Sequence, residues 1–224
     1  MRTTLLFNEG WLFAPEQLQD YVDDSHFTPI TLPHTNKLLP HHNFNDLEYQ
    51  FISTYRKRFT LPEPIAGRRV YLDFEGAMIA ATVSINGHTF PEHKGGYTPF
   101  SFDITEYVNF DGTNLLTVHL DSTERADIPP CGGVIDYLTF GGIYRDVYLR
   151  YVEPVHIDNV FIKGHGLMYD DERAEMVVTV RNQTYQTQSV AVVGALEFWR
   201  DEVGLLDVPA QSTATVSIWS DLRE

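Results

Sequence analysis

The sequence predicts an all-β protein, and two observations carry this prediction. Apolar side chains recur at every second position in several short segments, and this period places them on one face of a β-strand. One such segment ends in Asn86-Gly87, a pair typical of a two-residue hairpin because both central positions of a type I′ turn need a positive φ. Helical periodicity is nearly absent, and only Glu16–Val22 could form a turn or two of helix.

Four segments in the first two thirds of the chain show the alternation most clearly. In each of them three apolar residues are expected to face the core, and the polar residues between them face the other way. The expected core-facing residues are Val70, Leu72 and Phe74; Ala81, Val83 and Ile85; Phe100, Phe102 and Ile104; and Leu116, Val118 and Leu120.

A domain boundary is predicted near Glu153-Pro154, which divides the chain into residues 1–153 and 154–224. Loops that are polar or contain glycine separate strand-like segments in the second part, at the spacing of a β-sandwich. An immunoglobulin-like sandwich needs about seven strands in roughly 100 residues. The 71 residues of this part therefore predict an incomplete one, with four or five strands. The expected strands are His156–Lys163, Ala174–Arg181, Ser189–Phe198 and Thr213–Trp219.

Composition excludes several classes of function. The chain has 16 Lys and Arg residues against 31 Asp and Glu residues, a net charge of −15, and a surface of that sign repels the phosphates of nucleic acids. The basic clusters Arg56-Lys57-Arg58 and Arg68-Arg69 are too short to change this. No apolar run is long enough to span a membrane. The single cysteine and the absence of a secretory leader predict a cytoplasmic protein without disulfides.

Six motifs occur in an order that resembles the amino-terminal region of family 2 glycoside hydrolases, the group of β-galactosidases, β-glucuronidases and β-mannosidases. Each motif alone is weak, but together they cover almost the whole chain. They are Phe7–Phe13, Ile30–His34, Tyr55–Phe59, Ser84–Gly87 with Gly95–Thr105, Asn114–Val118 and Gly142–Val147.

The resemblance implies a jelly-roll β-sandwich of the galactose-binding type, followed by a truncated immunoglobulin-like β-sandwich. The catalytic (β/α)8 barrel of such enzymes has about 250 residues, which a chain of 224 residues cannot also contain. We therefore expect a non-catalytic region that contributes to the pocket rim of a retaining exo-β-glycosidase. Its partners would be a terminal β-glycoside, the missing barrel and further copies in a homo-oligomer. No cofactor and no metal ion are expected for this chain.

The resemblance also implies three sugar-contacting residues. Asp136 lies six residues before Gly142, and in β-galactosidases an aspartate at that offset contacts sugar hydroxyls and, in some members, a sodium ion. A carboxylate suits this role because it accepts hydrogen bonds from two hydroxyls. Tyr137 follows directly, and Gln50-Phe51 replaces an Asn-Pro pair, so that Gln50 could meet a hydroxyl. The competing interpretation makes Asp136 an exposed loop residue.

Other candidates have structural explanations. Asn8-Glu9 belongs to the first motif and is not expected to be a catalytic pair, and Asp170-Asp171-Glu172 is expected to be a solvated turn. Lone Cys131 has no evident base partner, and Asn182-Gln183-Thr184 is a glycosylation sequon that matters only in a secreted protein. Two rival functions stay open: an assembly module, and a free-standing lectin. The lectin would need an aromatic platform from Trp11, Trp199 or Trp219, whose patterns favour burial.

Overall fold

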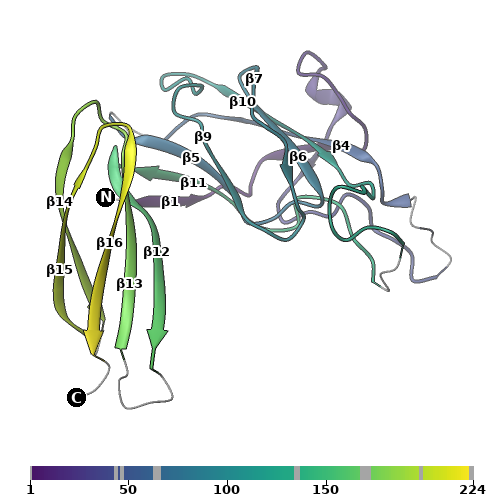
Figure 1. Cartoon of the computed structure of the whole chain (residues 1–224). Coiled ribbons are helices and arrows are strands. Elements are labelled where there is room, and N and C mark those ends of the chain that lie inside the picture. The colour runs from purple at the N-terminus through teal and green to yellow at the C-terminus, as the bar shows by residue number, and fades with distance from the viewer. Residues whose placement is uncertain are drawn as a thin grey trace. The chain divides into compact units, whose positions relative to one another are not determined.

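A computed structural model describes residues 2–42, 45, 48–62, 67–133, 137–166, 173–196 and 199–221. The chain forms two compact units, Arg2–Tyr151 and Val152–Glu224 (Figure 1). Apart from one short 3-10 helix, η1 (Asp24–His26), every regular element in the described part is a β-strand. The all-β prediction is therefore confirmed.

Two antiparallel sheets build the first unit. One sheet has the strand order β1-β11-β5-β9, and the other has the order β3-β2-β4-β10-β6-β7, with β8 also paired to β6. The strands of the first sheet are β1 (Thr3–Leu6), β5 (Arg69–Phe74), β9 (Phe100–Asp103) and β11 (Val147–Val152). Those of the second are β2 (Trp11–Ala14), β3 (Thr28–Ile30), β4 (Ile52–Phe59), β6 (Ala80–Ile85), β7 (His88–Thr89), β8 (His93–Lys94) and β10 (Asn114–Asp121).

The core of this unit includes all the alternating apolar residues that the sequence predicts for β5, β6 and β10. Their apolar side chains are at most 1% exposed and belong to a single cluster, to which both sheets contribute. The prediction for the third segment is only partly right. Ile104 is fully buried, whereas Phe100 and Phe102 are half-buried and pack against the outside of the cluster. They lie on β9, the last strand of its sheet, where the Phe100 ring stacks on Phe74 and His93 and the Phe102 ring packs on Phe90.

The hairpin is confirmed, and the short helix is not. Asn86 and Gly87 join β6 to β7 with φ values of 50° and 86°, as a type I′ turn requires. Glu16–Val22 contains no helix. The carbonyl oxygens of Gln19 and Val22 accept hydrogen bonds from the buried guanidinium of Arg56 instead of forming a helical ladder.

The second unit contains a three-stranded sheet, β12-β13-β16, and a two-stranded sheet, β14-β15. A small core between them includes Val178, Val180, Val192, Val208 and Ile218. The strand β15 was not among the four expected segments, because charged residues and a glycine interrupt its alternation. The bounds are β12 (Val155–His165), β13 (Arg173–Asn182), β14 (Gln188–Leu196), β15 (Trp199–Val208) and β16 (Ser212–Asp221).

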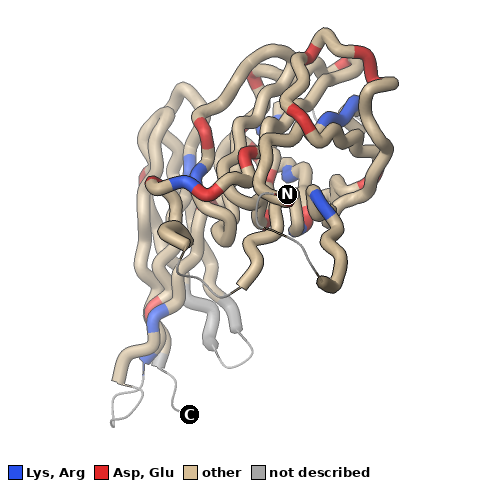
Figure 2. Tube along the Cα trace, turned by 90° about the vertical axis from the view of Figure 1, so that its right-hand side faces the viewer, with Lys and Arg blue, Asp and Glu red and all other residues tan. Residues whose placement is uncertain are grey.

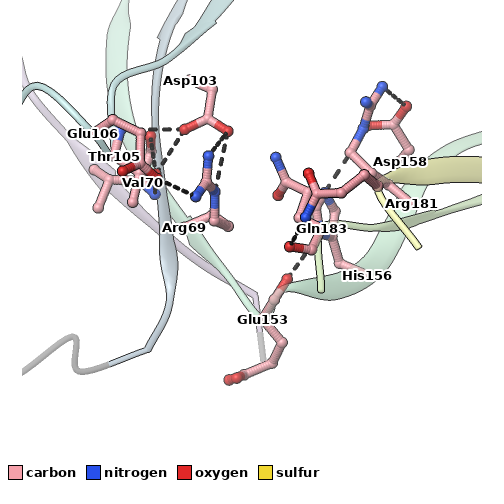
Figure 3. A network of polar contacts seen from close by, with 11 residues as sticks. Arg69, Val70, Asp103, Thr105, Glu106, Glu153, His156, Asp158, Arg181 and Gln183 are labelled. Atoms are coloured by element: carbon pink, nitrogen blue, oxygen red, sulfur yellow. Dashed lines mark hydrogen bonds and ion pairs between the residues drawn. The ribbon is translucent and has the colours of Figure 1, made fainter. Parts of the chain in front are cut away.

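The two basic clusters of the sequence do not form a phosphate-binding surface among the described residues. Arg56 is fully buried, Lys57 is nearly so, and Arg58 pairs with Asp24. Arg69 points toward the carboxylates of Asp103 and Glu106, as Figure 3 shows. Lys and Arg are scattered along the described trace rather than gathered in one patch (Figure 2). Within the part that the structure describes, no helix is long and apolar enough to cross a membrane.

Candidate functional site

A small polar pocket opens on the first unit where three loops meet. Tyr49 and Gln50 come from the segment before β4, Glu124 from the loop after β10, and Tyr137 from the segment before β11. The pocket holds about 60 Å³. It brings together Gln50 and Tyr137, two of the three residues that the family resemblance implies as sugar contacts. Asp136 lies outside the described residues.

Glu124 connects the walls of this pocket. Its backbone N–H donates to Oε1 of Gln50 at 3.4 Å, and its carboxylate accepts from the backbone N–H groups of Gly132 at 2.5 Å and Gly133 at 3.2 Å. The two glycines have φ values of 94° and 62°, a region that glycine enters without the steric cost of a Cβ atom. Sequence reasoning missed Glu124, since no motif spacing marks a carboxylate that bonds only to backbone.

The segment that carries Gln50 is fixed by Asn36, whose side chain is buried. The side-chain amide of Asn36 donates to the carbonyl of Tyr49 at 2.8 Å, and its backbone N–H donates to the carbonyl of Gly141 at 3.0 Å. A Cβ atom at Gly142 would lie 2.3 Å from the carbonyl oxygen of His34, and φ there is 122°. Gly142 therefore permits the close approach that holds these segments together, in line with its expected structural role.

A larger and mainly apolar groove lies beside the polar pocket. Residues 35–41 form one wall and residues 138–140 the other, and its volume is about 700 Å³. Met78 and Thr139 line both the groove and the pocket. Tyr97, which lines the groove, also forms a hydrogen bond with Tyr137 of the pocket. Desolvation of its phenol group and this hydrogen bond raise the pKa of Tyr97 to about 12.

Asn8 and Glu9 form hydrogen bonds within the first unit. The Asn8 side chain donates to Asp146 at 2.7 Å and accepts from the Val147 N–H at 3.0 Å, and Glu9 accepts from the Thr31 hydroxyl. Asn8 therefore ties the segment before β2 to the start of β11, and Glu9 contacts the residue that follows β3. Among the described residues no group of three or more His, Cys, Asp or Glu side chains could hold a metal ion. Asp170-Asp171-Glu172 lies outside them.

The sequon asparagine is also structural. Asn182 is fully buried, and its amide donates to the carbonyl oxygens of Gln186, Val208 and Pro209 at 2.7, 3.0 and 3.1 Å. In the folded state this side chain is not accessible to a glycosylating enzyme.

Of the three tryptophans considered for a sugar-binding platform, the structure describes the side chains of Trp11 and Trp219. Trp11 is fully buried, as predicted, and its indole N–H donates to the Phe7 carbonyl at 2.7 Å. The prediction that Trp219 is buried was wrong, because 44% of it is exposed. Its ring, on the strand β16, contacts the His165 ring at 5.0 Å and the Arg173 guanidinium at 5.7 Å. The side chain of Trp199 lies outside the described ones.

Known proteins are similar to this chain in sequence and in fold. The chain is 46% identical over 183 residues to a β-galactosidase of Thermoanaerobacter pseudethanolicus, an alignment that covers 80% of this chain and 24% of that protein. It is 32% identical over 173 residues to a β-glucuronidase of Formosa agariphila, covering 70% and 18%. The structure of Bacteroides uniformis β-glucuronidase 2 matches 98% of this chain and 28% of its own, with a TM-score of 0.84 and 29% identity.

The chain thus spans about a quarter of the length of the relatives it matches. Residues 11–154, which contain both sheets of the first unit apart from β1, match the model for the sugar binding domain of glycosyl hydrolases family 2. The order of the six motifs, the two-sheet sandwich and this match agree: the chain belongs to the sugar binding domain family of the family 2 glycosyl hydrolases.

Proposed function

We propose that the polar pocket forms part of the substrate-pocket rim of a retaining exo-β-glycosidase, with the catalytic carboxylates supplied by another domain of a longer polypeptide. The observation that carries this proposal is the convergence of Gln50 and Tyr137 in one pocket of a sugar-binding domain. The sugar would be a terminal β-galactoside or β-glucuronide, because the relatives are named for these two activities.

The chemistry of the pocket suits hydroxyl groups. The Gln50 amide can both donate and accept hydrogen bonds, and its Oε1 bond to the Glu124 N–H orients it. The Tyr137 hydroxyl has the same two capacities. Asp136, from its place in the sequence directly before Tyr137, would add a carboxylate that binds two hydroxyls. Such contacts discriminate between sugars and hold the terminal residue in place.

The described residues of the pocket do not supply the two carboxyl groups that a retaining hydrolysis uses. A retaining glycosidase needs two carboxyl groups about 5–5.5 Å apart, one as acid/base and one as nucleophile. Glu124 is the only carboxylate among the described pocket residues, and Gly132 and Gly133 already donate to it. A second domain would therefore have to bring both reacting groups.

The test uses the product of the intact gene and, separately, residues 1–224. The intact product should hydrolyse an aryl β-galactoside or β-glucuronide with retention of configuration, and residues 1–224 alone should not. Gln50→Ala and Asp136→Asn should each lower kcat/KM roughly 10- to 100-fold, which corresponds to about 1.4–2.7 kcal/mol for lost hydrogen bonds.

Gln17→Ala is the matched control, since Gln17 is an exposed glutamine of the same unit outside the pocket. Its kcat/KM should stay within twofold of the parent. Hydrolysis by residues 1–224 alone, or kcat/KM values for Gln50→Ala and Asp136→Asn equal to that of Gln17→Ala, would refute the proposal.

A further inference from the structure

The outer face of the three-stranded sheet in the second unit carries two exposed aromatic rings. Trp219 on β16 is 44% exposed, and Phe161 on β12 is 56% exposed. We propose that this face is a second carbohydrate-binding site, on which neutral β-linked hexose units stack against the two rings. It shares no described residue with the polar pocket of the first unit, so the proposal does not rest on the function proposed above.

Strand register places both rings on the same face of the sheet β12-β13-β16 (Figure 1). Side chains of directly opposite residues in antiparallel strands share a face, and so do residues two positions apart on one strand. Trp219 lies opposite Glu175 of β13, and Glu175 lies opposite Lys163 of β12. Phe161 is two residues from Lys163. Ile218, the neighbour of Trp219, points to the other face and belongs to the core of the unit.

The separation of the rings matches a short oligosaccharide. Phe161 and Trp219 lie on the two outer strands of the sheet, two strands apart and displaced by two residues along the strand direction. A strand spacing of about 4.8 Å and a rise of about 3.4 Å per residue place their Cα atoms about 12 Å apart. The outer units of a linear trisaccharide are spaced comparably. Each can therefore lay the apolar C–H face of its ring on one aromatic side chain and remove both surfaces from water.

Polar side chains lie between the two rings. One carboxylate oxygen of Glu175 accepts a hydrogen bond from the Ser217 hydroxyl at 2.7 Å. The other lies 3.4 Å from Nζ of Lys163 and 3.3 Å from Nε2 of His165. The His165 ring in turn contacts the Trp219 ring, with 5.0 Å between the centroids. This row offers both donors and acceptors, which suits sugar hydroxyls because a hydroxyl has both capacities.

The charges of the face favour a neutral ligand. Lys163 pairs with Glu175, and Arg181 on the same face pairs with Asp158 at 2.8 Å. The Arg173 guanidinium lies 5.7 Å from the centre of the tryptophan ring. A face whose cations lie beside carboxylates or a ring attracts no strongly charged partner. A second copy of the chain is disfavoured because the net charge of −15 opposes self-association. An uncharged sugar polymer meets no such repulsion.

Native affinity electrophoresis of the intact gene product tests the proposal. The gels contain soluble β-1,4-galactan, galactomannan or mixed-linkage β-glucan, and an exo-acting enzyme leaves these polymers long. Trp219→Ala and Phe161→Ala each remove one ring, and Trp219→Tyr keeps an aromatic face. Tyr185→Ala is the matched control, because Tyr185 is 90% exposed in the same unit and lies in the loop between β13 and β14. Gln50→Ala controls for the polar pocket.

We expect at least one polysaccharide to retard the parent, Tyr185→Ala and Gln50→Ala equally. Trp219→Ala and Phe161→Ala should each need roughly tenfold more polysaccharide for the same retardation, because each loses one stacking surface. Trp219→Tyr should stay close to the parent. Because Trp219→Ala also removes the contact with His165, the same loss in Phe161→Ala, on the other outer strand, separates binding from a local change at β16.

Three results would overturn the inference. The first is a parent that none of the polysaccharides retards, and the second is equal retardation of the parent and both ring variants. The third is retardation that Gln50→Ala abolishes and Trp219→Ala keeps, which would place binding in the polar pocket and support the proposed function instead. Conversely, Trp219-dependent retardation of an intact product that hydrolyses no aryl β-glycoside upholds this inference and contradicts the proposed function.

Discussion

The carboxylate of Glu124 accepts the backbone N–H of Gly133 at 3.2 Å, across the mouth of the loop that leads to Tyr137. The same oxygen also accepts from Gly132. Two backbone donors aimed at one carboxylate fix this end of the loop, while the Glu124 N–H fixes Gln50. Both walls of the polar pocket thus depend on one residue that need not touch a sugar.

Replacement of Glu124 should loosen this loop. In Glu124→Ala the two glycine N–H groups lose their acceptor, which costs about 0.5–1 kcal/mol at an exposed site. Cys131, which directly precedes Gly132, should then react with a thiol reagent roughly threefold faster. Glu124→Gln keeps an acceptor oxygen and should react at the parent rate. Equal rates in all three proteins would show that the carboxylate does not hold the loop.

Gly142→Ala should destabilise the first unit by about 2–5 kcal/mol. The added Cβ would lie 2.3 Å from the His34 carbonyl oxygen, and overpacking of this kind costs about 1–3 kcal/mol; the positive φ adds about 1–2 kcal/mol. Gly67→Ala is the control, with a φ of 83° and no atom within 4 Å of the added Cβ, so only the second cost applies. Urea unfolding followed by tryptophan fluorescence measures both. Equal losses of unfolding free energy in Gly142→Ala and Gly67→Ala would contradict the close approach of Gly142 to the His34 carbonyl.

Two arginines that bind the same aspartate should differ strongly. Arg56 is completely buried and donates to Asp24 at 2.8 Å and to two backbone carbonyls, whereas the Arg58 side chain is 49% exposed. Arg56→Ala removes a buried charge from its partners and should cost about 3–5 kcal/mol. Arg58→Ala should cost at most about 1 kcal/mol. Denaturant titration of both variants measures the free energy of unfolding. If Arg58→Ala lowers it as much as Arg56→Ala does, burial does not make Arg56 the more important partner of Asp24.

Stability should fall with acid in part because of His34. Burial lowers the pKa of His34 below its usual value of about 6.5, so the folded state favours the neutral imidazole, whose Nδ1 lies 2.9 Å from the Tyr55 hydroxyl. A lowered pKa means that the stabilisation is complete above pH 6.5 and is lost as the pH falls through the folded pKa.

The measurement is Tm between pH 7.5 and 5. His34→Gln should show a smaller fall in Tm than the parent does. Burial also lowers the pKa of His93, so His93→Gln should flatten the same pH range and the double variant should flatten it further. A fall in Tm that is identical in the parent and in His34→Gln would exclude the histidine as its source.

Local patterns determined much of this protein. Period-two alternation identified β5, β6 and β10 and their buried faces, because a strand places every second side chain on one side whatever its neighbours are. Asn86-Gly87 predicted its hairpin because the backbone angles of the turn belong to those two residues. The family followed from six motifs, since their order along the chain is itself a property of the sequence.

Only the tertiary structure determined which residues distant in sequence contact one another. Glu124 meets Gly133 through a loop whose path no spacing rule predicts. Arg56, on a strand distant in sequence, donates hydrogen bonds to the carbonyl oxygens of Gln19 and Val22, in the segment that could have formed a turn or two of helix. Trp219 sits in a strand pattern that favours burial and is nevertheless exposed, because burial depends on a facing surface that its own sequence does not supply. The pocket and the groove arise in the same way, from loops that the sandwich brings to one edge.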